Sequence, residues 1–316
     1  MRVVVTGGAG FIGANLAAHL VGEGHEVVAL DDLSTGRREN LAGSGASLVV
    51  GSILDADVLD EVLAGAAAVV HLAARPSVPR SIADPVASHR VNDLGTIEVL
   101  EAVRRRGPGA PHLLVASSSS VYGSNPHLPK HEDLATRPVS PYAATKLATE
   151  AYALAWGASF DLDVLAFRFF NVFGPLQPAG HAYAAVVPAF VDAALAGRPL
   201  PVHGDGRQSR DFTYVGSVCR VIGDALARRV SSPLPMNLAF GSRVTLLELI
   251  DALEAELGHP LERDHLPTRP GDVPHSQADS SRLRAELPDL EPVPLAEGLR
   301  ATVAWFRAEL EGTPPG

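Results

Sequence analysis

The chain has 316 residues, of which 46% are hydrophobic and 20% are charged. This composition is that of a globular protein with room for one large α/β domain and a smaller lobe, and it excludes a disordered chain. The formal net charge of −10 argues against a general nucleic-acid binder and against adsorption to an anionic membrane, and no apolar run reaches the ~18 residues of a membrane helix.

Residue usage adds two constraints. Cys219 is the single cysteine, so no internal disulfide can form. The chain begins with an apolar run, Arg2–Val5, rather than with a secretory leader, and we therefore expect a cytoplasmic protein. Lysine is rare, and of the two lysines we expect Lys130 to lie at the surface, whereas Lys146 belongs to a motif discussed below.

The first half of the chain alternates short apolar runs with amphipathic stretches rich in alanine and leucine. The runs expected to be strands are Val3–Val5, Val27–Leu30, Leu48–Val50, Ala68–Leu72, Leu113–Ser117 and Val164–Phe169. The stretches expected to be helices are Phe11–Leu20, Val58–Leu63, Pro85–Arg106 and Tyr142–Trp156. Continuous apolar strands that alternate with helices predict right-handed βαβ crossovers. The predicted fold class is therefore α/β, with a doubly wound parallel sheet of the Rossmann type.

The alternation ends after Phe170, where glycine and proline become frequent. Helices are expected at Val187–Ala196, Leu246–Leu257 and Leu295–Leu310, short strands at Pro199–His203 and Asn237–Ala239, and an irregular course over 258–294. We expect residues 1–170, with returning segments near 211–240, to form an NAD-binding domain. Residues 171–316 are expected to form mainly a smaller C-terminal α/β lobe that binds the substrate.

A glycine-rich turn, Thr6–Gly13, joins the first strand to the first helix and contains Gly7, Gly10 and Gly13. Glycine allows a tight turn, and the helix N-terminus adds free amides and a partial positive charge that suit a pyrophosphate. Asp31 closes the second strand, where a carboxylate can accept hydrogen bonds from ribose hydroxyls and repel a 2′-phosphate. The pattern predicts NAD rather than NADP; the alternative is an ordinary turn with Asp31 as its cap.

Tyr142 and Lys146 are one helical turn apart in a run whose Pro141 suits a helix start. An ammonium group on the same face favours the phenolate, so we expect Lys146 to lower the pKa of Tyr142 and make it a general base. The serine run Ser117–Ser120 follows an expected strand, where a doubly wound sheet places its ligand. Tyr-x-x-x-Lys alone is also typical of a packing pair, and the serine run favours the catalytic interpretation.

These features resemble the extended short-chain dehydrogenase/reductase superfamily and, more closely, the UDP-galactose 4-epimerase family with its UDP-N-acetylglucosamine 4-epimerase members. The resemblance covers nearly the whole chain. Its further motifs are Asp31–Gly36, Ser77–Ser81, Val121–Gly123, Arg168–Gly174, Ala182–Pro188, Gly204–Gly206, Ser209–Phe212 and Arg269–Val273. It implies a 4-epimerase of UDP-sugars that holds NAD tightly and works through a transient 4-keto sugar. It also implies a homodimer formed through the helices expected at 85–106 and 142–156.

The resemblance assigns roles to matching positions. Ser118, Tyr142 and Lys146 are the implied catalytic residues, with Tyr142 as the base for the sugar 4-hydroxyl and Ser118 as a proton relay. The implied cofactor-binding residues are Gly7, Gly10, Phe11, Ile12, Gly13, Asp31, Asp32, Ser34, Thr35, Gly36, Ser52, Ile53, Leu72, Ala73, Ala74, Asn92, Tyr142, Lys146 and Phe169. The implied substrate-binding residues are Ser77, Val78, Arg80, Ser118, Ser119, Ser120, Asn171, Ala185, Val186, Val187, Pro201, Val202, His203, Arg210, Arg269, Asp272 and Ser276.

Four positions bear on the reaction and the substrate. Ser52 stands where the family usually has an acidic residue near the adenine, although a serine can still accept a hydrogen bond. Ser119 and Ser120 replace the Asp-Glu pair of related 4,6-dehydratases, and serine has no suitable pKa for eliminating water. Ser276 is small where a tyrosine would narrow the sugar pocket. We therefore expect UDP-GlcNAc and UDP-GalNAc as preferred substrates, with UDP-Glc and UDP-Gal also accepted.

Other functions stay open. Arg75 and Arg80 could pair with a substrate carboxylate, which makes a UDP-glucuronate 4-epimerase the second candidate. Another nucleotide-sugar-modifying member of the superfamily, such as a net oxidoreductase with an exchangeable cofactor, is a third. A non-catalytic NAD-sensing protein is disfavoured because it would need none of the three catalytic residues. No nucleic-acid, membrane or metal partner is expected.

Overall fold

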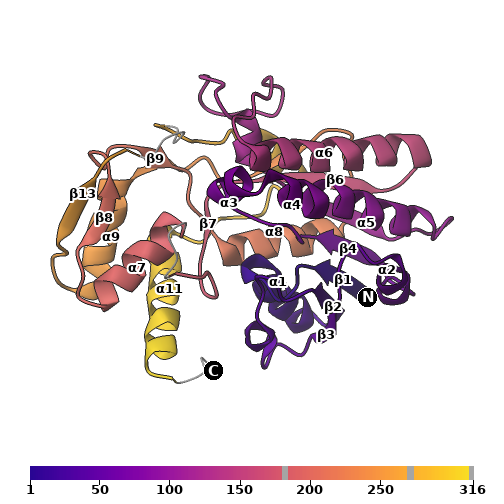
Figure 1. The fold of residues 1–316 in the computed structure, drawn as a ribbon, viewed down its shortest axis with the longest axis horizontal. Coiled ribbons are helices and arrows are strands. Elements are labelled where there is room, and N and C mark those ends of the chain that lie inside the picture. The colour runs from indigo at the N-terminus through magenta and orange to yellow at the C-terminus, as the bar shows by residue number, and fades with distance from the viewer. Residues whose placement is uncertain (180–183, 269–273, 313–316) are drawn as a thin grey trace.

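The computed structural model, which describes residues 1–179, 184–268 and 274–312, has a seven-stranded parallel sheet at the centre of its larger body (Figure 1). In spatial order the strands are β11 (Met236–Leu238), β6 (Val164–Phe169), β5 (His112–Ser118), β4 (Ala68–His71), β1 (Arg2–Thr6), β2 (Glu26–Asp31) and β3 (Ser47–Val50). The chain order reverses between β1 and β4, which is the switch point of a doubly wound sheet. The predicted α/β Rossmann-type fold class is confirmed.

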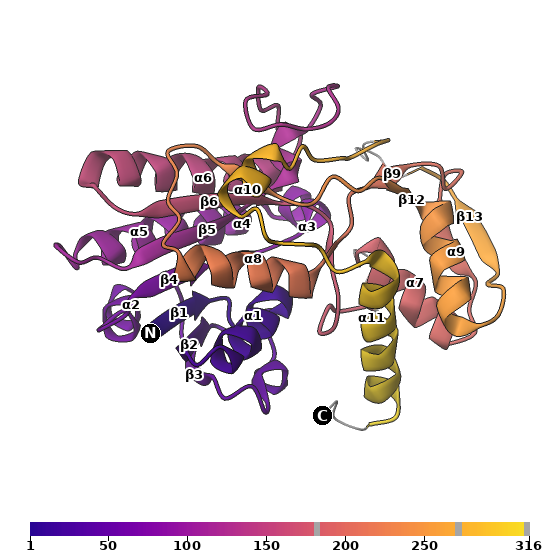
Figure 2. The ribbon, with the colours of Figure 1, turned by 180° about the vertical axis from the view of Figure 1, so that it is seen from behind.

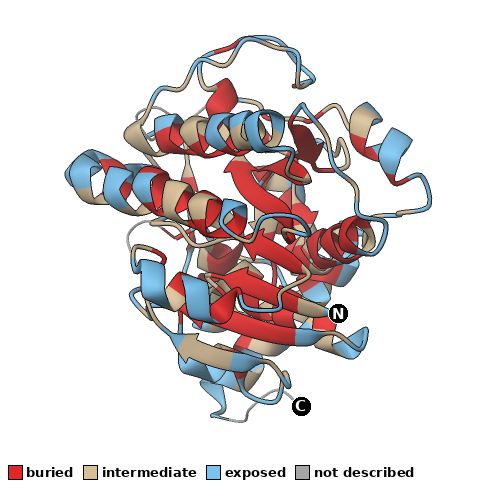
Figure 3. Ribbon diagram, turned by 90° about the vertical axis from the view of Figure 1, so that its right-hand side faces the viewer, coloured by how far each residue is buried: buried red, intermediate tan, exposed pale blue. Residues whose placement is uncertain are grey.

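Helices cover both faces of this sheet. The helices on one face are α1 (Phe11–Gly22), α8 (Val215–Ala227) and α10 (Ser281–Glu286) (Figure 2). The helices on the other face are α2 (Ala56–Val62), α5 (Gly95–Arg104) and α6 (Pro141–Phe160). The central strands β1, β4 and β5 are consequently buried along most of their length (Figure 3). None of the helices in the described ranges is long and apolar enough to cross a membrane.

The helix expected at Pro85–Arg106 is present from Pro85 to Arg104, with a π-helical turn inside it. A short α4 (Pro85–His89) leads through a π-helical turn, Arg90–Leu94, into α5. A separate helix, α3 (Val78–Ala83), precedes α4 and was not expected, because only one of its six residues is buried and its sequence has no helical periodicity. π-Helical turns of this kind often occur at functional sites.

Two segments of the second half join the large sheet. β11 pairs in parallel with β6, and α8 packs beside α1. The sequence indicated only that segments near 211–240 return to this sheet. The helix α8 itself escaped prediction because its valines, isoleucine and glycines are weak helix formers, so tertiary packing stabilises it.

The smaller body stands beside the large sheet, at the left of Figure 1. Its elements are α7 (Val186–Leu195), α9 (Leu246–Leu257), α11 (Leu295–Leu310) and the parallel pair β8 (Leu200–His203) with β13 (Arg263–Leu266). Two more pairs are β7 (Val172–Phe173) with β10 (Thr213–Tyr214) and β9 (Ser209–Arg210) with β12 (Val244–Thr245). The irregular course expected over 258–294 is wrong for β13 and α10. β13 escaped prediction because it is an exposed edge strand without an apolar run.

The surface position expected for Lys130 is also wrong. Lys130 is buried, and its ammonium group donates a hydrogen bond to the carbonyl oxygen of Asn125. Its backbone pairs with the segment around Ala278, at the far end of the chain. Burial lowers the pKa of Lys130. A contact between segments so distant in sequence leaves no local pattern from which it could be predicted.

Candidate active site

The glycine turn lies at the carboxyl end of β1, where the strand passes into α1. Gly7 has a φ of +69°, and its amide donates to the carbonyl oxygen of Leu30 at 2.7 Å. A Cβ atom on Gly13 would lie 2.1 Å from the carbonyl oxygen of Gly7, so the turn closes only around a glycine. Gly10 caps α1 without a side-chain hydrogen bond, and the first turn has no acidic residue. Phe11, Ile12 and Gly13 therefore present backbone amides that suit a phosphate group.

Asp31 ends β2 beside this turn and is buried. Its Oδ2 accepts a hydrogen bond from the amide of Ala9 at 2.9 Å, and its Oδ1 accepts one from the amide of Leu33 at 2.8 Å. Burial raises the pKa of Asp31, and these backbone hydrogen bonds lower it. The structure therefore shows the turn-capping role, and a carboxylate with about four acceptor positions can still receive ribose hydroxyls. A Cβ atom on Gly36 would lie 2.8 Å from both oxygens, so Gly36 leaves space at this carboxylate.

The loops after β2, β3 and β4 supply the other predicted cofactor residues. Asp32 accepts hydrogen bonds from the amide and hydroxyl of Ser34, at 2.9 and 2.6 Å, and Thr35 follows in the same loop. The hydroxyl of Ser52 accepts from the amide of Leu54, and the neighbouring Ile53 is buried. Residues 72–74 (Leu72, Ala73 and Ala74) follow β4, and Phe169 ends β6. All of these positions lie at the carboxyl edge of the sheet.

Asn92 lies in the π-helical turn, and its side chain forms hydrogen bonds within the protein. Its Oδ1 accepts a hydrogen bond from the amide of Arg75 at 2.7 Å, and its Nδ2 donates to the hydroxyl of Thr145 at 3.0 Å. The residue therefore joins the loop after β4 to the helix α6. Its predicted contact with a cofactor stays a prediction.

Ser118 and Tyr142 meet where β5 ends and α6 begins. A hydrogen bond with Ser118 lowers the pKa of Tyr142, but burial has the larger effect and raises it. The expected lowering of the pKa of Tyr142 is therefore wrong for the protein alone, because desolvation outweighs the hydrogen bond with Ser118. Ser119 and Ser120 continue into a short turn, in which the amide of Ser120 donates to the Ser118 hydroxyl at 3.2 Å.

Lys146 is buried one helical turn after Tyr142. Its ammonium group donates a hydrogen bond to the carbonyl oxygen of Ala116 at 2.8 Å. Burial lowers the pKa of Lys146 to about 8, and the nearby carboxylate of Asp93 counteracts this effect. His71, also fully buried, has its pKa lowered to about 3 and is therefore neutral beside the ammonium group. The site thus contains one buried positive charge that can change its protonation state near neutral pH.

A buried ion pair connects α6 to the central sheet. Glu150 and Arg168 form a salt bridge of 2.6 Å with only 4% of either side chain exposed. Glu150 also accepts a hydrogen bond from the hydroxyl of Ser117 at 2.7 Å, directly before Ser118. The pair therefore joins α6, β5 and β6 immediately below the catalytic side chains. None of these contacts was anticipated, because the partners come from three separate elements.

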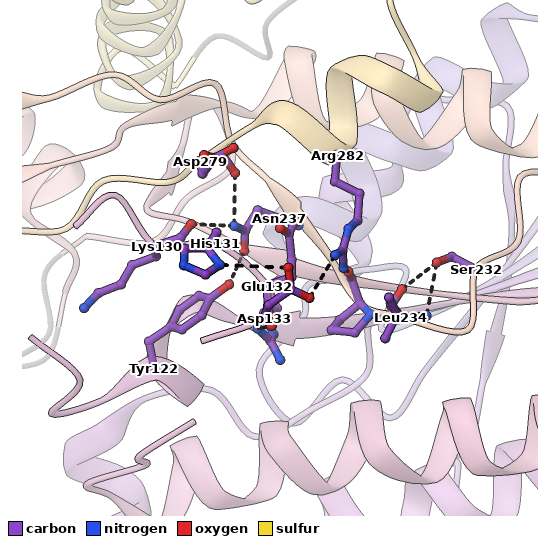
Figure 4. Close-up of polar contacts among 12 residues, drawn as sticks. Tyr122, Lys130, His131, Glu132, Asp133, Ser232, Leu234, Asn237, Asp279 and Arg282 are labelled. Atoms are coloured by element: carbon purple, nitrogen blue, oxygen red, sulfur yellow. Dashed lines mark hydrogen bonds and ion pairs between the residues drawn. The ribbon is translucent and has the colours of Figure 1, made fainter. Parts of the chain in front are cut away.

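A second buried group supports the serine turn from the edge of the sheet. Tyr122, which ends the turn, donates its hydroxyl to Oδ1 of Asn237 in β11 at 2.7 Å (Figure 4). The Nδ2 group of Asn237 donates to the carbonyl oxygens of Lys130 and Asp279, at 2.8 and 3.1 Å (Figure 4). Glu132 accepts from the amide of Asn237 at 2.8 Å. The side chain of Asn237 thus connects β11 to three other parts of the chain, at Tyr122, Lys130 and Asp279.

A cavity of about 210 Å³ opens in the smaller body. The predicted substrate residues that line it are Asn171, Ala185, Val186, Val187, Pro201, His203 and Arg210. Arg210 donates hydrogen bonds to the carbonyl oxygens of Ser209 and Pro274, at 2.9 and 3.3 Å. The lining residues that the sequence did not indicate are Val172, Phe173, Gln177, Ala184, Ala189, Phe190, Gln208, Phe212 and Leu246. Most are apolar, so composition alone did not separate them from core residues.

Some predicted substrate residues lie elsewhere. Val202 is buried in the core of the smaller body and is not among the residues that line the cavity. Ser77, Val78 and Arg80 belong to α3 or its cap, close to the start of α6. Ser276 is buried beside β9, where its amide donates to the carbonyl oxygen of Ser209 at 3.0 Å. Arg269 and Asp272 lie outside the described residues.

Comparison with known proteins decides the family. Residues 3–239 match the model of the NAD dependent epimerase/dehydratase family. A UDP-glucose 4-epimerase from Mycolicibacterium smegmatis is 39% identical over 97% of this chain and 99% of its own length. The chain belongs to the NAD-dependent epimerase/dehydratase family.

Solved structures of the family agree with this assignment. A UDP-N-acetylglucosamine 4-epimerase from Methanobrevibacter ruminantium, in complex with UDP-N-acetylmuramic acid, is 36% identical, has a TM-score of 0.91 and covers 98% of both chains. A UDP-glucose 4-epimerase from Thermus thermophilus, in complex with NAD, is 36% identical with a TM-score of 0.86, over 97% of this chain and 99% of that one. The predicted resemblance, the epimerase class of enzyme and the NAD cofactor are confirmed.

The glycine turn fits this cofactor on structural grounds as well. The close packing of Gly13 against Gly7 keeps the turn tight, and the first turn of α1, which has no side-chain cap, leaves amide donors for a pyrophosphate. Within the described parts of the chain, no group of three or more His, Cys, Asp or Glu residues could hold a metal ion.

Proposed function

We propose that this family member is a 4-epimerase of UDP-sugars, acting on UDP-GlcNAc and UDP-GalNAc in preference to UDP-Glc and UDP-Gal. The observation that carries the proposal is the hydrogen bond between Ser118 and Tyr142 where β5 ends, at the same carboxyl edge of the sheet as the glycine turn. A hydroxyl and a phenol in contact, with a lysine one turn away, form a proton-transfer set. The cavity in the smaller body gives the nucleotide a separate site.

In this proposal the turn at Gly7–Gly13 and the carboxylate of Asp31 hold NAD, with Lys146 near the ribose of its nicotinamide. When bound, NAD supplies a hydride acceptor at C4 of the sugar and afterwards the hydride donor. Tyr142 takes the proton from the 4-hydroxyl group, and Ser118 relays it. Because burial raises the pKa of Tyr142, positive charge near the phenol is needed to stabilise the phenolate. Residues 171–316 mainly serve the substrate.

The nucleotide would occupy the cavity of the smaller body. Arg210 and, in the family pattern, Arg269 and Asn171 would hold the diphosphate, because guanidinium groups match phosphate geometry. His203 lines the same cavity and would lie against the uracil. The small Ser276 would leave room for a 2-acetamido group.

The competing reactions are less well supported. Dehydration needs an acid and a base after the relay serine, whereas Ser119 and Ser120 occupy these positions. Recognition of glucuronate would fall to Arg80, because the other candidate, Arg75, lies 3.7 Å from the carboxylate of Asp84. A sensing function would not require the contact between Ser118 and Tyr142.

We also propose a homodimer formed through α4, α5 and α6. Exposed apolar side chains gather on these helices and their neighbours: Ile82, Val86, Leu94, Tyr152 and Phe160. A face of this kind typically marks an interface. Since the single cysteine, Cys219, is buried and free, the chain needs no oxidising compartment, and we place its activity in the cytoplasm.

The test is incubation of the purified protein with a panel of UDP-sugars and no added NAD, followed by chromatographic separation of the C4 epimers. We expect interconversion of UDP-GlcNAc and UDP-GalNAc, with slower conversion of UDP-Glc and UDP-Gal. Complete inactivity on the acetamido pair would refute the proposed preference. Activity on UDP-glucuronate alone would replace the proposal by its second candidate.

A further inference from the structure

The helices α3 and α6 meet at a single buried hydroxyl group. Ser81 is 0% exposed and is the only buried residue of α3. Its Oγ accepts a hydrogen bond from the backbone amide of Tyr142 at 3.0 Å and donates one to the carbonyl oxygen of Val78 at 2.7 Å. One side chain therefore connects the backbone of the proposed base to a neighbouring helix.

The start of α6 shows why this contact is specific to Tyr142. The first amides of a helix have no partner within the helix and need one from elsewhere. Pro141 has no amide hydrogen, and the amide of Ala143 donates to the hydroxyl of the N-cap Ser140 at 3.1 Å. The amide of Tyr142 instead donates its hydrogen bond to a residue of another helix, Ser81 of α3. A side chain of α3 thus caps the backbone amide of Tyr142, the proposed base.

The same hydroxyl also anchors α3. This helix has six residues, too few to be stable without tertiary contacts. It begins at Ser77, which has a φ of +99°, a strained conformation of the kind found at functional sites. Ser77, Val78 and Arg80, all predicted to contact substrate, are carried by this segment. Displacing Ser81 would therefore shift α3 and Tyr142 relative to each other.

We propose that Ser81 is a positioning residue, which fixes Tyr142 against Ser118 and sets α3 against the same site. The role rests on the proposed function of Tyr142 as the base. Without the hydroxyl, the amide of Tyr142 loses its partner and α3 loses its buried anchor. The contact between Tyr142 and Ser118 then becomes looser, and proton transfer is the step that suffers.

The experiment compares Ser81→Ala with two matched serine variants. Ser140→Ala removes the neighbouring cap of the same helix and leaves α3 untouched. Ser88→Ala removes another fully buried serine, whose hydroxyl contacts only the carbonyl oxygen of Asp84 at 3.1 Å. Ser81→Thr keeps a hydroxyl at the position. Each protein is measured for kcat, KM, the pH profile of kcat/KM, bound NAD and the Kd of UDP.

We expect Ser81→Ala to lower kcat by about tenfold, as the loss of one well-placed hydrogen bond implies, with KM, UDP binding and NAD content within twofold of the unmodified protein. The rising limb of its pH profile should move to higher pH, because the contact with Ser118 weakens. Ser140→Ala should lower the melting temperature but kcat by less than about threefold, and Ser88→Ala should leave kcat unchanged. Ser81→Thr should recover most of the loss.

Two results would overturn the role of Ser81. One is a kcat for Ser81→Ala equal to that of Ser88→Ala. The other is an equal loss in Ser81→Ala and Ser140→Ala with an unshifted pH profile, which would mean that the serine only caps a helix. Absence of turnover by the unmodified protein on every UDP-sugar would instead refute the proposed function, and the positioning role with it.

Discussion

The two sides of the site are built in different ways. On the cofactor side, one continuous turn between β1 and α1 supplies the amides, and Asp31 at the end of the adjacent strand braces it at 2.9 Å. On the substrate side, residues from α7, β8 and β9 meet only because long-range hydrogen bonds hold them. The buried Asp211, for example, accepts hydrogen bonds from Gly241, Ser242 and Ala278. In the proposed function, a local turn holds NAD, and tertiary packing forms the site for the nucleotide of the substrate.

This difference predicts how the cofactor side and the substrate side of the proposed site respond to substitution. Changes in the glycine turn should affect NAD alone, because the turn is locally determined. Changes around Ser276 should affect the choice of sugar alone. Changes at Tyr142 should affect turnover and leave the binding of both ligands unchanged, and changes in the buried ion pair of α6 should affect the stability of the fold. The following predictions test this separation, from the largest expected effect to the smallest.

Tyr142→Phe removes the proposed base and keeps the aromatic ring. We expect kcat to fall by about 10³-fold or more, within the range typical of general acid–base groups. Bound NAD, measured by absorbance after denaturation, and the affinity for UDP, measured by calorimetry, should not change. Turnover within tenfold of the unmodified protein would show that another group accepts the proton.

Glu150→Ala breaks the buried ion pair that joins Glu150 of α6 to Arg168 of β6. An unpaired charge in this position should lower the free energy of unfolding by about 3–5 kcal/mol, measured by denaturant titration. Asp163→Ala is the matched control, since its pair with Arg229 also has a 2.6 Å contact but side chains that are 43% and 52% exposed. That control should cost less than about 1 kcal/mol. Equal losses would mean that burial does not distinguish the two pairs.

Gly13→Ala places a Cβ atom 2.1 Å from the carbonyl oxygen of Gly7. The turn must then open, at a cost of about 1–3 kcal/mol, and NAD should bind about tenfold or more weakly. Gly22→Ala, at the end of the same helix, is the control because its Cβ would have no neighbour within 4 Å. UDP binding should be unchanged in both variants. Retention of NAD by Gly13→Ala through gel filtration and dialysis would show that the turn does not hold the pyrophosphate.

Ser276→Tyr fills the space proposed for the acetamido group. We expect kcat/KM to fall by about tenfold or more on UDP-GlcNAc, as overpacking implies, and by less than about threefold on UDP-Glc. NAD content should stay the same, which would keep the effect on the substrate side. An equal loss on both sugars would remove Ser276 as the origin of the preference.

Ser118→Ala removes the hydrogen bond that lowers the pKa of Tyr142. A base acts when it is deprotonated, so kcat/KM rises with pH through the pKa of Tyr142. With the lowering contact gone, this rise should move to higher pH, and activity at neutral pH should fall about fivefold or more. A pH profile that keeps its midpoint would show that Ser118 does not act on the phenol.

The sequence predicted the cofactor side more completely than the substrate side, and the reason is the same difference in construction. The turn with Gly7, Gly10 and Gly13 is local, so spacing alone indicated it. The residues Asn171 and Arg210 were indicated only by resemblance to a family, because the segments that bring them together are far apart in the chain. The buried contacts of Ser81 and Glu150 left no signal, since a single serine or glutamate on a helix resembles many others. The pKa of Tyr142 was misjudged because the sequence reveals the neighbouring lysine but not the burial that outweighs it.

The most direct test of the account follows one atom. UDP-GlcNAc carrying deuterium at C4 is incubated with the purified protein and no added NAD, and the UDP-GalNAc formed is examined by mass spectrometry and NMR. Oxidation and reduction at C4 within one closed site, with Tyr142 handling only the hydroxyl proton, predict a product that keeps the deuterium at C4. Failure to form the epimer, or formation of an epimer whose C4 deuterium has exchanged with water, would contradict the account.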